Sequence, residues 1–147
     1  MSHTDTLAPV TAPASASALR SSRRIPRRVG AVLAGLIAIF AVTAAVDAVM
    51  HATGVFPPAG APMSGALFLL AFAYRFVIDV AGSWLTARLA PDRPLRHALA
   101  LGWVGLALSV TGALAMWDAG PHWYPIALAA SALPCAWLGG RLQARRA

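Results

Sequence analysis

Four long runs of apolar residues alternate with short polar segments along this chain of 147 residues. The runs cover roughly residues 29–50, 63–89, 97–117 and 123–140. Each is close to the roughly 20 residues with which a helix crosses a hydrocarbon core of about 30 Å. The second run is long enough to tilt, and the last is short. The pattern therefore predicts an all-α membrane protein, with a bundle of four transmembrane helices in residues 25–147.

The segment before the first run has a different character. Residues 1–24 are rich in Ser, Thr, Ala and Pro and have no apolar period, which predicts a disordered tail. A basic cluster lies at the end of this segment and just before the first run. Each charge near a membrane surface contributes about 1 kcal/mol of attraction to anionic lipid headgroups. The cluster consists of Arg20, Arg23, Arg24, Arg27 and Arg28.

Charge alternates between the connecting segments. Residues 53–62 and 118–122 contain no Arg, whereas residues 88–96 contain three and the C-terminus carries Arg141, Arg145 and Arg146. The positive-inside rule then places both termini and the central turn in the cytoplasm, and Trp and Tyr residues cluster near both predicted interfaces. A cleavable signal peptide over the first run is the alternative, but that run exceeds the usual 7 to 15 apolar residues.

Composition supports a membrane protein and excludes several other classes. The chain is 59% hydrophobic and only 12% charged, which is too apolar for an ordinary soluble domain. Its net charge of +7 comes from Arg residues that mostly flank the apolar runs, so it indicates topology and not a nucleic-acid partner. The single Cys135 rules out a disulfide within the chain, and no catalytic motif is present. We therefore expect no enzyme activity and no cofactor.

Small residues recur at the three- and four-residue spacing at which transmembrane helices pack closely. Chance in an Ala- and Gly-rich chain is the competing explanation, chiefly for the first run. The two predicted contact seams are Ala31, Ala34, Ala38, Ala41, Ala45 and Ala48 in the first run, and Ala98, Gly102, Gly105, Ser109 and Gly112 in the third.

The second run contains two charged residues one helical turn apart, Arg75 and Asp79. Arg75 lies about twelve residues from the predicted external end, or roughly 18 Å along a helix, close to the bilayer midplane. A charge there costs on the order of 3 kcal/mol on insertion scales, so it must face the bundle and be paired. Asp79 is the local partner, and Asp47 in the first run is the second candidate because an Arg side chain leans toward its own helix N-terminus. Three interpretations stay open: an ion pair that only fixes helix register, a polar centre for a proton, ion or anionic ligand, and a contact with a partner helix.

A polar motif occurs twice at the predicted external face. Asp47 and His51 precede an aromatic-Pro pair, and Asp118 and His122 precede another. Carboxylates and imidazoles suit a divalent metal. Such residues more often cap helices and form hydrogen bonds at the interface, and we assign no metal to His51, Asp118 and His122.

Most of the chain after the tail resembles an uncharacterised family of small bacterial four-helix integral membrane proteins. The similarity lies in Tyr74 and Arg75, Gly82, and the segments 85–91, 96–99, 120–125 and 133–141. The resemblance implies a multi-pass protein of the bacterial plasma membrane and marks Arg75 and the His122 loop as family features. It implies no activity.

Two functions fit these observations. The first is a non-enzymatic structural or interaction subunit, with a membrane-protein partner or a second copy of the chain packed on the small-residue seams. The second is a minimal transporter or channel subunit with Asp47, Arg75 and Asp79 as its polar centre. Water access to Arg75 distinguishes them.

Overall fold

The computed structural model describes residues 14–58 and 60–146, and every regular element in these ranges is helical. Four α-helices and one short 3₁₀ turn follow each other along the chain. They are α1 (Ala14–Ala52), α2 (Gly65–Leu89), α3 (Pro94–Ala115), η1 (Trp117–Ala119) and α4 (Trp123–Ala144). The predicted all-α class is confirmed.

Three of these helices are long and apolar enough to cross a membrane: the Pro26–Ala52 part of α1, α2 and α3. The prediction of a membrane protein is therefore supported by three helices. Helix α4 spans 22 residues but is not among the candidates. It begins with Trp123, Tyr124 and Pro125 and contains Pro134, and these residue types lower its hydropathy.

Helix α1 begins earlier than the sequence suggested. Residues 14–24, expected to belong to a disordered tail, form its first turns, and the helix continues through Pro26. Residues 1–13 of the predicted tail lie outside the described residues. The expectation rested on the lack of apolar residues to bury, but a helix that is already nucleated extends without burial when its sequence is rich in Ala.

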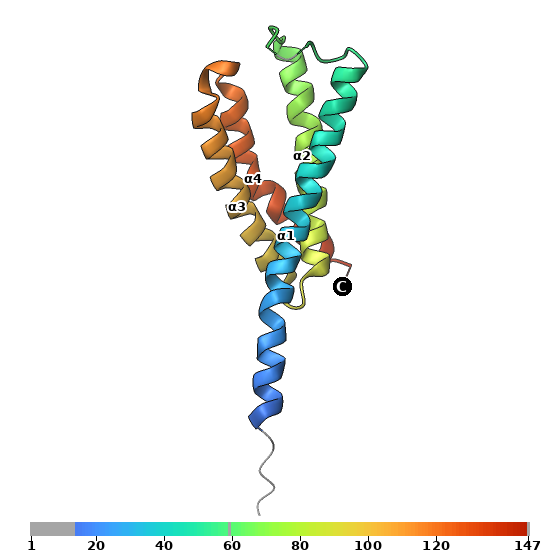
Figure 1. Cartoon of the computed structure of the whole chain (residues 1–147), viewed down its shortest axis with the longest axis vertical. Coiled ribbons are helices and arrows are strands. Elements are labelled where there is room, and N and C mark those ends of the chain that lie inside the picture. Colours follow the sequence, from blue (N-terminus) through green and yellow to red (C-terminus); the bar gives the residue numbers. More distant parts are fainter. Residues whose placement is uncertain (1–13, 59, 147) are drawn as a thin grey trace, which may run out of the picture.

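The connections lie at two opposite ends of the molecule (Figure 1). Residues 53–58, 60–64 and 116–122 occupy one end, which we call the loop end. The α2–α3 turn and the end of α4 occupy the other, which we call the arginine end. An ion pair of 2.5 Å between Arg28 and Asp92 ties α1 to this turn. The basic segments on either side of α2 are thus brought together.

Close packing of small residues closes the arginine end. A Cβ atom added to Gly139 on α4 would lie 2.5 Å from the carbonyl oxygen of Val80 on α2. One added to Gly102 on α3 would lie 2.5 Å from the Cβ of Ala136 on α4. Gly35 on α1 similarly faces Thr86 on α2. Glycine lets these backbones approach, as in other membrane helix pairs.

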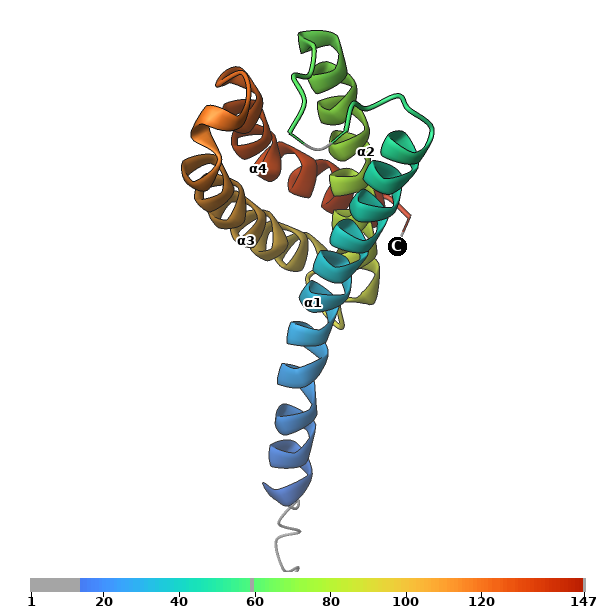
Figure 2. The same ribbon diagram turned by 45° about the horizontal axis from the view of Figure 1, so that its top comes forward.

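Toward the loop end the backbones of α1 and α2 diverge from those of α3 and α4 (Figures 1 and 2), and we call these two pairs the limbs. Side chains still join them there, because the ring of Phe68 on α2 packs on Tyr124 of α4 at a centroid distance of 5.1 Å. The predicted seams follow this division. Ala31 and Ala98 near the arginine end are buried, at 3% and 0% exposure. Ala41, Ala45 and Ala48 are exposed, so the first seam is not used within the chain beyond its first half. Spacing alone did not reveal that the helices diverge.

Candidate functional site

Arg75 joins three helices through its guanidinium group. From α2, its Nη2 donates a hydrogen bond of 2.7 Å to Oδ2 of Asp47 on α1. Its Nη1 donates a hydrogen bond of 2.7 Å to the hydroxyl oxygen of Tyr124 on α4. The guanidinium therefore bridges the two limbs, and its charge is paired with a carboxylate as a charge in a bilayer requires.

Two phenols complete this group. Tyr74 donates its hydroxyl hydrogen to Oδ1 of Asp47, so both carboxylate oxygens of Asp47 accept a bond. The guanidinium carbon of Arg75 lies 5.9 Å from the ring centroids of both Tyr74 and Tyr124, within the range of cation–π attraction. We call Asp47, Tyr74, Arg75 and Tyr124 the polar bridge.

The structure corrects the expected partner of Arg75. The sequence favoured Asp79 and kept Asp47 as second candidate, and the ion pair is with Asp47. The side chain of Arg75 leans toward the N-terminus of α2, which is at the loop end, and Asp79 lies one turn in the opposite direction. Within residues 26–58 and 60–146, Asp79 forms no hydrogen bond or ion pair with another side chain. It interacts with Arg75 through Coulombic attraction alone.

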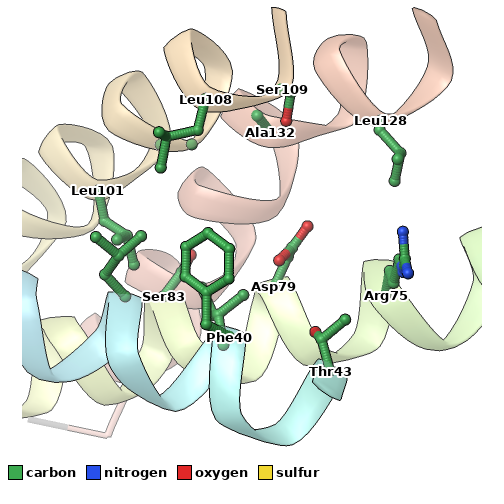
Figure 3. A pocket seen from close by; sticks show the side chains of 14 residues that line it. Phe40, Thr43, Arg75, Asp79, Ser83, Leu101, Leu108, Ser109, Leu128 and Ala132 are labelled. Atoms are coloured by element: carbon green, nitrogen blue, oxygen red, sulfur yellow. The ribbon is translucent and has the colours of Figure 1, made fainter. Parts of the chain in front are cut away.

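Asp79 faces a cavity of about 180 Å³ that all four helices line. Figure 3 shows its carboxylate directed into the space between the helices, with Phe40 and Thr43 of α1 beside it. We call this space the Asp79 cavity. Its other lining side chains are mostly apolar and include Leu36, Ile39, Leu101, Leu108, Leu128 and Ala132.

A second cavity, of about 410 Å³, lies toward the loop end. We call it the His51 cavity. Its lining includes Asp47, His51, Phe56, Phe68, Trp117 and Tyr124. Arg75, Ser109 and Leu128 line both cavities, so the polar bridge lies at the boundary between them.

The glycines of the third-run seam show how this space arises. A Cβ added to Gly105 or Gly112 would have no neighbouring atom within 4 Å, unlike one added to Gly102. Gly105 lines the Asp79 cavity and Gly112 the His51 cavity. The loop-end half of this predicted contact seam therefore faces open space, which corrects its assignment as a helix–helix contact.

The external polar motif does not assemble into one cluster. On α1, a ring nitrogen of His51 lies 2.9 Å from the carbonyl oxygen of Asp47, and the ring packs edge-on against Phe56. His122 instead stacks on Trp117 at a centroid distance of 4.4 Å, and Asp118 lies in η1. In the described part of the chain, no three His, Cys, Asp or Glu residues form a group able to hold a metal.

The sequence pattern did not predict the two phenols of the polar bridge. It indicated an interfacial position for Tyr124 and no particular role for Tyr74. A signal was present, because a phenol within an apolar span needs a hydrogen-bond partner, and Tyr74 is adjacent to the buried Arg75. Ser109 was placed in a packing seam, although it lines both cavities. Cys135 is fully buried, as expected of a packing residue.

No protein-family model, curated protein or solved structure matches the chain. The resemblance to small bacterial membrane proteins therefore stays a prediction. What the site can do follows from its chemistry alone: it presents fixed charges, a phenol hydroxyl and a carboxylate to two cavities between the helices. Such convergent polar groups in a largely apolar cavity are typical of sites that bind small molecules.

Proposed function

We propose that the protein is a non-enzymatic membrane protein that binds a small solute between its two limbs and acts as the subunit of a minimal transporter. The observation that carries this proposal is the placement of Arg75 on the boundary of two adjoining cavities. An ion pair that only fixes the register of two helices is expected among tightly packed side chains, and such packing is found at the arginine end. Arg75 of the polar bridge instead lines two cavities.

The proposal includes four membrane crossings, with both termini in the cytoplasm of a bacterial cell. Helix α4 packs along α3 and α2, and its 22 residues correspond to about 33 Å of helix, which is enough to cross. Arg28, Arg93, Arg96 and Arg141 lie in the segments at or next to the arginine end. This distribution supports a cytoplasmic arginine end in contact with anionic headgroups, together with the N-terminal Arg cluster.

An interaction subunit is the second candidate, and a separate observation favours it. Ala41, Ala45 and Ala48 form an exposed small-residue face on α1, and Gly105 and Gly112 have no packing neighbour. A helix of a partner, or of a second copy, packed on such residues would fill the space and exclude water. The two functions therefore differ in whether the cavities contain water.

Thiol labelling tests this difference. In a Cys135→Ala background, Ser109→Cys places a thiol at the boundary of the two cavities, and Ser131→Cys places one on α4 at a position that is 8% exposed and lines neither cavity. The proposal predicts that a water-soluble methanethiosulfonate modifies the first variant at least about tenfold faster than the second in lipid nanodiscs. Equally slow labelling of both would refute the transporter and favour the interaction subunit.

A further inference from the structure

The charges around the two cavities do not balance. Asp47 and Arg75 form an ion pair, and both oxygens of Asp47 and both terminal nitrogens of Arg75 already have hydrogen-bond partners. Asp79 adds a second carboxylate. With His51 counted as neutral, the cavity walls carry a formal charge of −1, located at Asp79.

We infer that the solute is a small organic cation, held in the Asp79 cavity with Asp79 as its counter-ion. This inference rests on the proposed solute-binding function and names the class of solute. A cation would give Asp79 the close ionic partner that it lacks among the described side chains, and a charge inside a membrane protein is stabilised by such a partner.

The remaining walls of the cavity suit an organic cation better than a metal ion. Asp79 is the only carboxylate among the lining residues, and Phe40 is the aromatic one. The side chains of Phe40 and Asp79 line the same cavity (Figure 3). An aromatic face attracts an alkylammonium group by about 0.5–2 kcal/mol, whereas a hard metal ion requires several oxygen ligands.

Size sets a further limit. An apolar cavity of about 150 Å³ holds a benzene-sized molecule. The Asp79 cavity, at about 180 Å³, is therefore matched to a cation of roughly that size. A larger solute would extend past Arg75 into the His51 cavity.

An anion is disfavoured by the same contacts. Of the three guanidinium nitrogens of Arg75, only Nε has no hydrogen-bond partner among the described groups, and this atom is buried. To bind through its terminal nitrogens, an anion would have to displace Asp47 or Tyr124. It would also lie close to the carboxylate of Asp79, and like charges in a low-dielectric site repel strongly.

Equilibrium binding of two small probes to the full chain tests the inference. The probes are benzylammonium and benzoate, which are similar in size, opposite in charge and close to the size that the Asp79 cavity admits. The protein is held in nanodiscs of zwitterionic lipid, so that the membrane surface does not concentrate either probe. We expect the wild-type chain to bind the cation at least about tenfold more tightly than the anion. This comparison requires no variant to fold.

Three variants locate the site. Asp79→Asn removes the charge and is expected to weaken cation binding at least about tenfold, whereas Asp79→Glu retains the charge and stays within about threefold of wild type. The matched control is Asp118→Asn, which removes a carboxylate outside both cavity linings and should bind like wild type.

Several results would overturn the inference. These are equal or tighter binding of the anion, unchanged cation binding by Asp79→Asn in a folded protein, an equal loss with Asp118→Asn, and no cation binding at millimolar concentration. If Ser109→Cys is labelled rapidly while one of these results is found, the water-filled site stands and only the solute class is wrong. If Ser109→Cys is not labelled, the proposed function itself fails.

Discussion

Arg75 on α2 and Tyr124 on α4 are joined by a hydrogen bond of 2.7 Å that crosses from one limb of the bundle to the other. Tyr74, by contrast, bonds to Asp47 within the limb formed by α1 and α2. The two phenols thus make chemically similar contacts with different structural consequences, since only one of them holds the limbs together.

Removing each hydroxyl separately tests this division. Tyr124→Phe and Tyr74→Phe should each lower the free energy of unfolding by about 1 kcal/mol, the usual contribution of one hydrogen bond. Only Tyr124→Phe should also broaden the distance distribution between spin labels at Val55 and Ala119, one on each loop-end connection, in double electron–electron resonance. The assignment is wrong if both variants give the wild-type distribution or broaden it equally.

Two glycine substitutions compare the closed and open ends of the bundle. Gly139→Ala forces a methyl group against the α2 backbone and should destabilise the protein by about 1–3 kcal/mol, as overpacking does. Gly105→Ala adds the same group where no atom lies within 4 Å and should raise stability by up to about 1 kcal/mol, because Ala is the better helix former. Thermal unfolding in detergent gives both values. Equal destabilisation would mean that the loop-end half of α3 is packed after all.

The sequence predicted the helical class and the membrane character because both depend on local composition. It also identified Arg75 as the residue that must be paired, since the cost of a charge in lipid does not depend on the fold. The partner was not fixed by the sequence. Asp79 and Asp47 are both within reach of an Arg side chain in principle, and the choice depends on how α1 packs against α2.

The cavities were beyond sequence reasoning for a related reason. Gly102 and Gly105 belong to the same small-residue pattern, yet one contacts α4 and the other lines a cavity. Spacing defines a face of a helix, but the crossing angle decides how far along that face a neighbour remains in contact. Likewise, the start of α1 at Ala14 depends on helix extension and not on apolar pattern.

The crossing of α4 is tested by reporter fusions in a bacterial host. If α4 crosses, alkaline phosphatase fused after Gly120 should be active and a fusion after Ala147 inactive, while green fluorescent protein after Ala147 should fluoresce. This follows from the predicted external position of residues 118–122. Active phosphatase at both positions would place the end of α4 on the same side as its start and remove the fourth crossing.

The ion pair of the polar bridge allows stability and function to be separated. Asp47→Leu alone and Arg75→Met alone should each lower the free energy of unfolding by about 2–3 kcal/mol, because each leaves one half-buried charge within the membrane without its partner. The double variant leaves no unpaired charge but removes the hydrogen-bond partners of Tyr74 and Tyr124, so it should lie about 2 kcal/mol below wild type and well above the sum of the single variants. Thermal unfolding of the four proteins completes the cycle, and a double variant as unstable as the sum of the singles would contradict this account.

The most direct test of the central claim, that the polar bridge maintains a water-filled site and not merely the fold, is thiol labelling in that same double variant. With Ser109→Cys in the Cys135→Ala background, we compare labelling rates with and without Asp47→Leu and Arg75→Met. Since the double variant removes two of the three charged side chains that line the cavities, the account predicts a labelling rate at least about tenfold lower in a double variant that stays folded. An unchanged rate would show that the bridge does not hydrate the cavities, and loss of the folded protein would show that it is a structural lock.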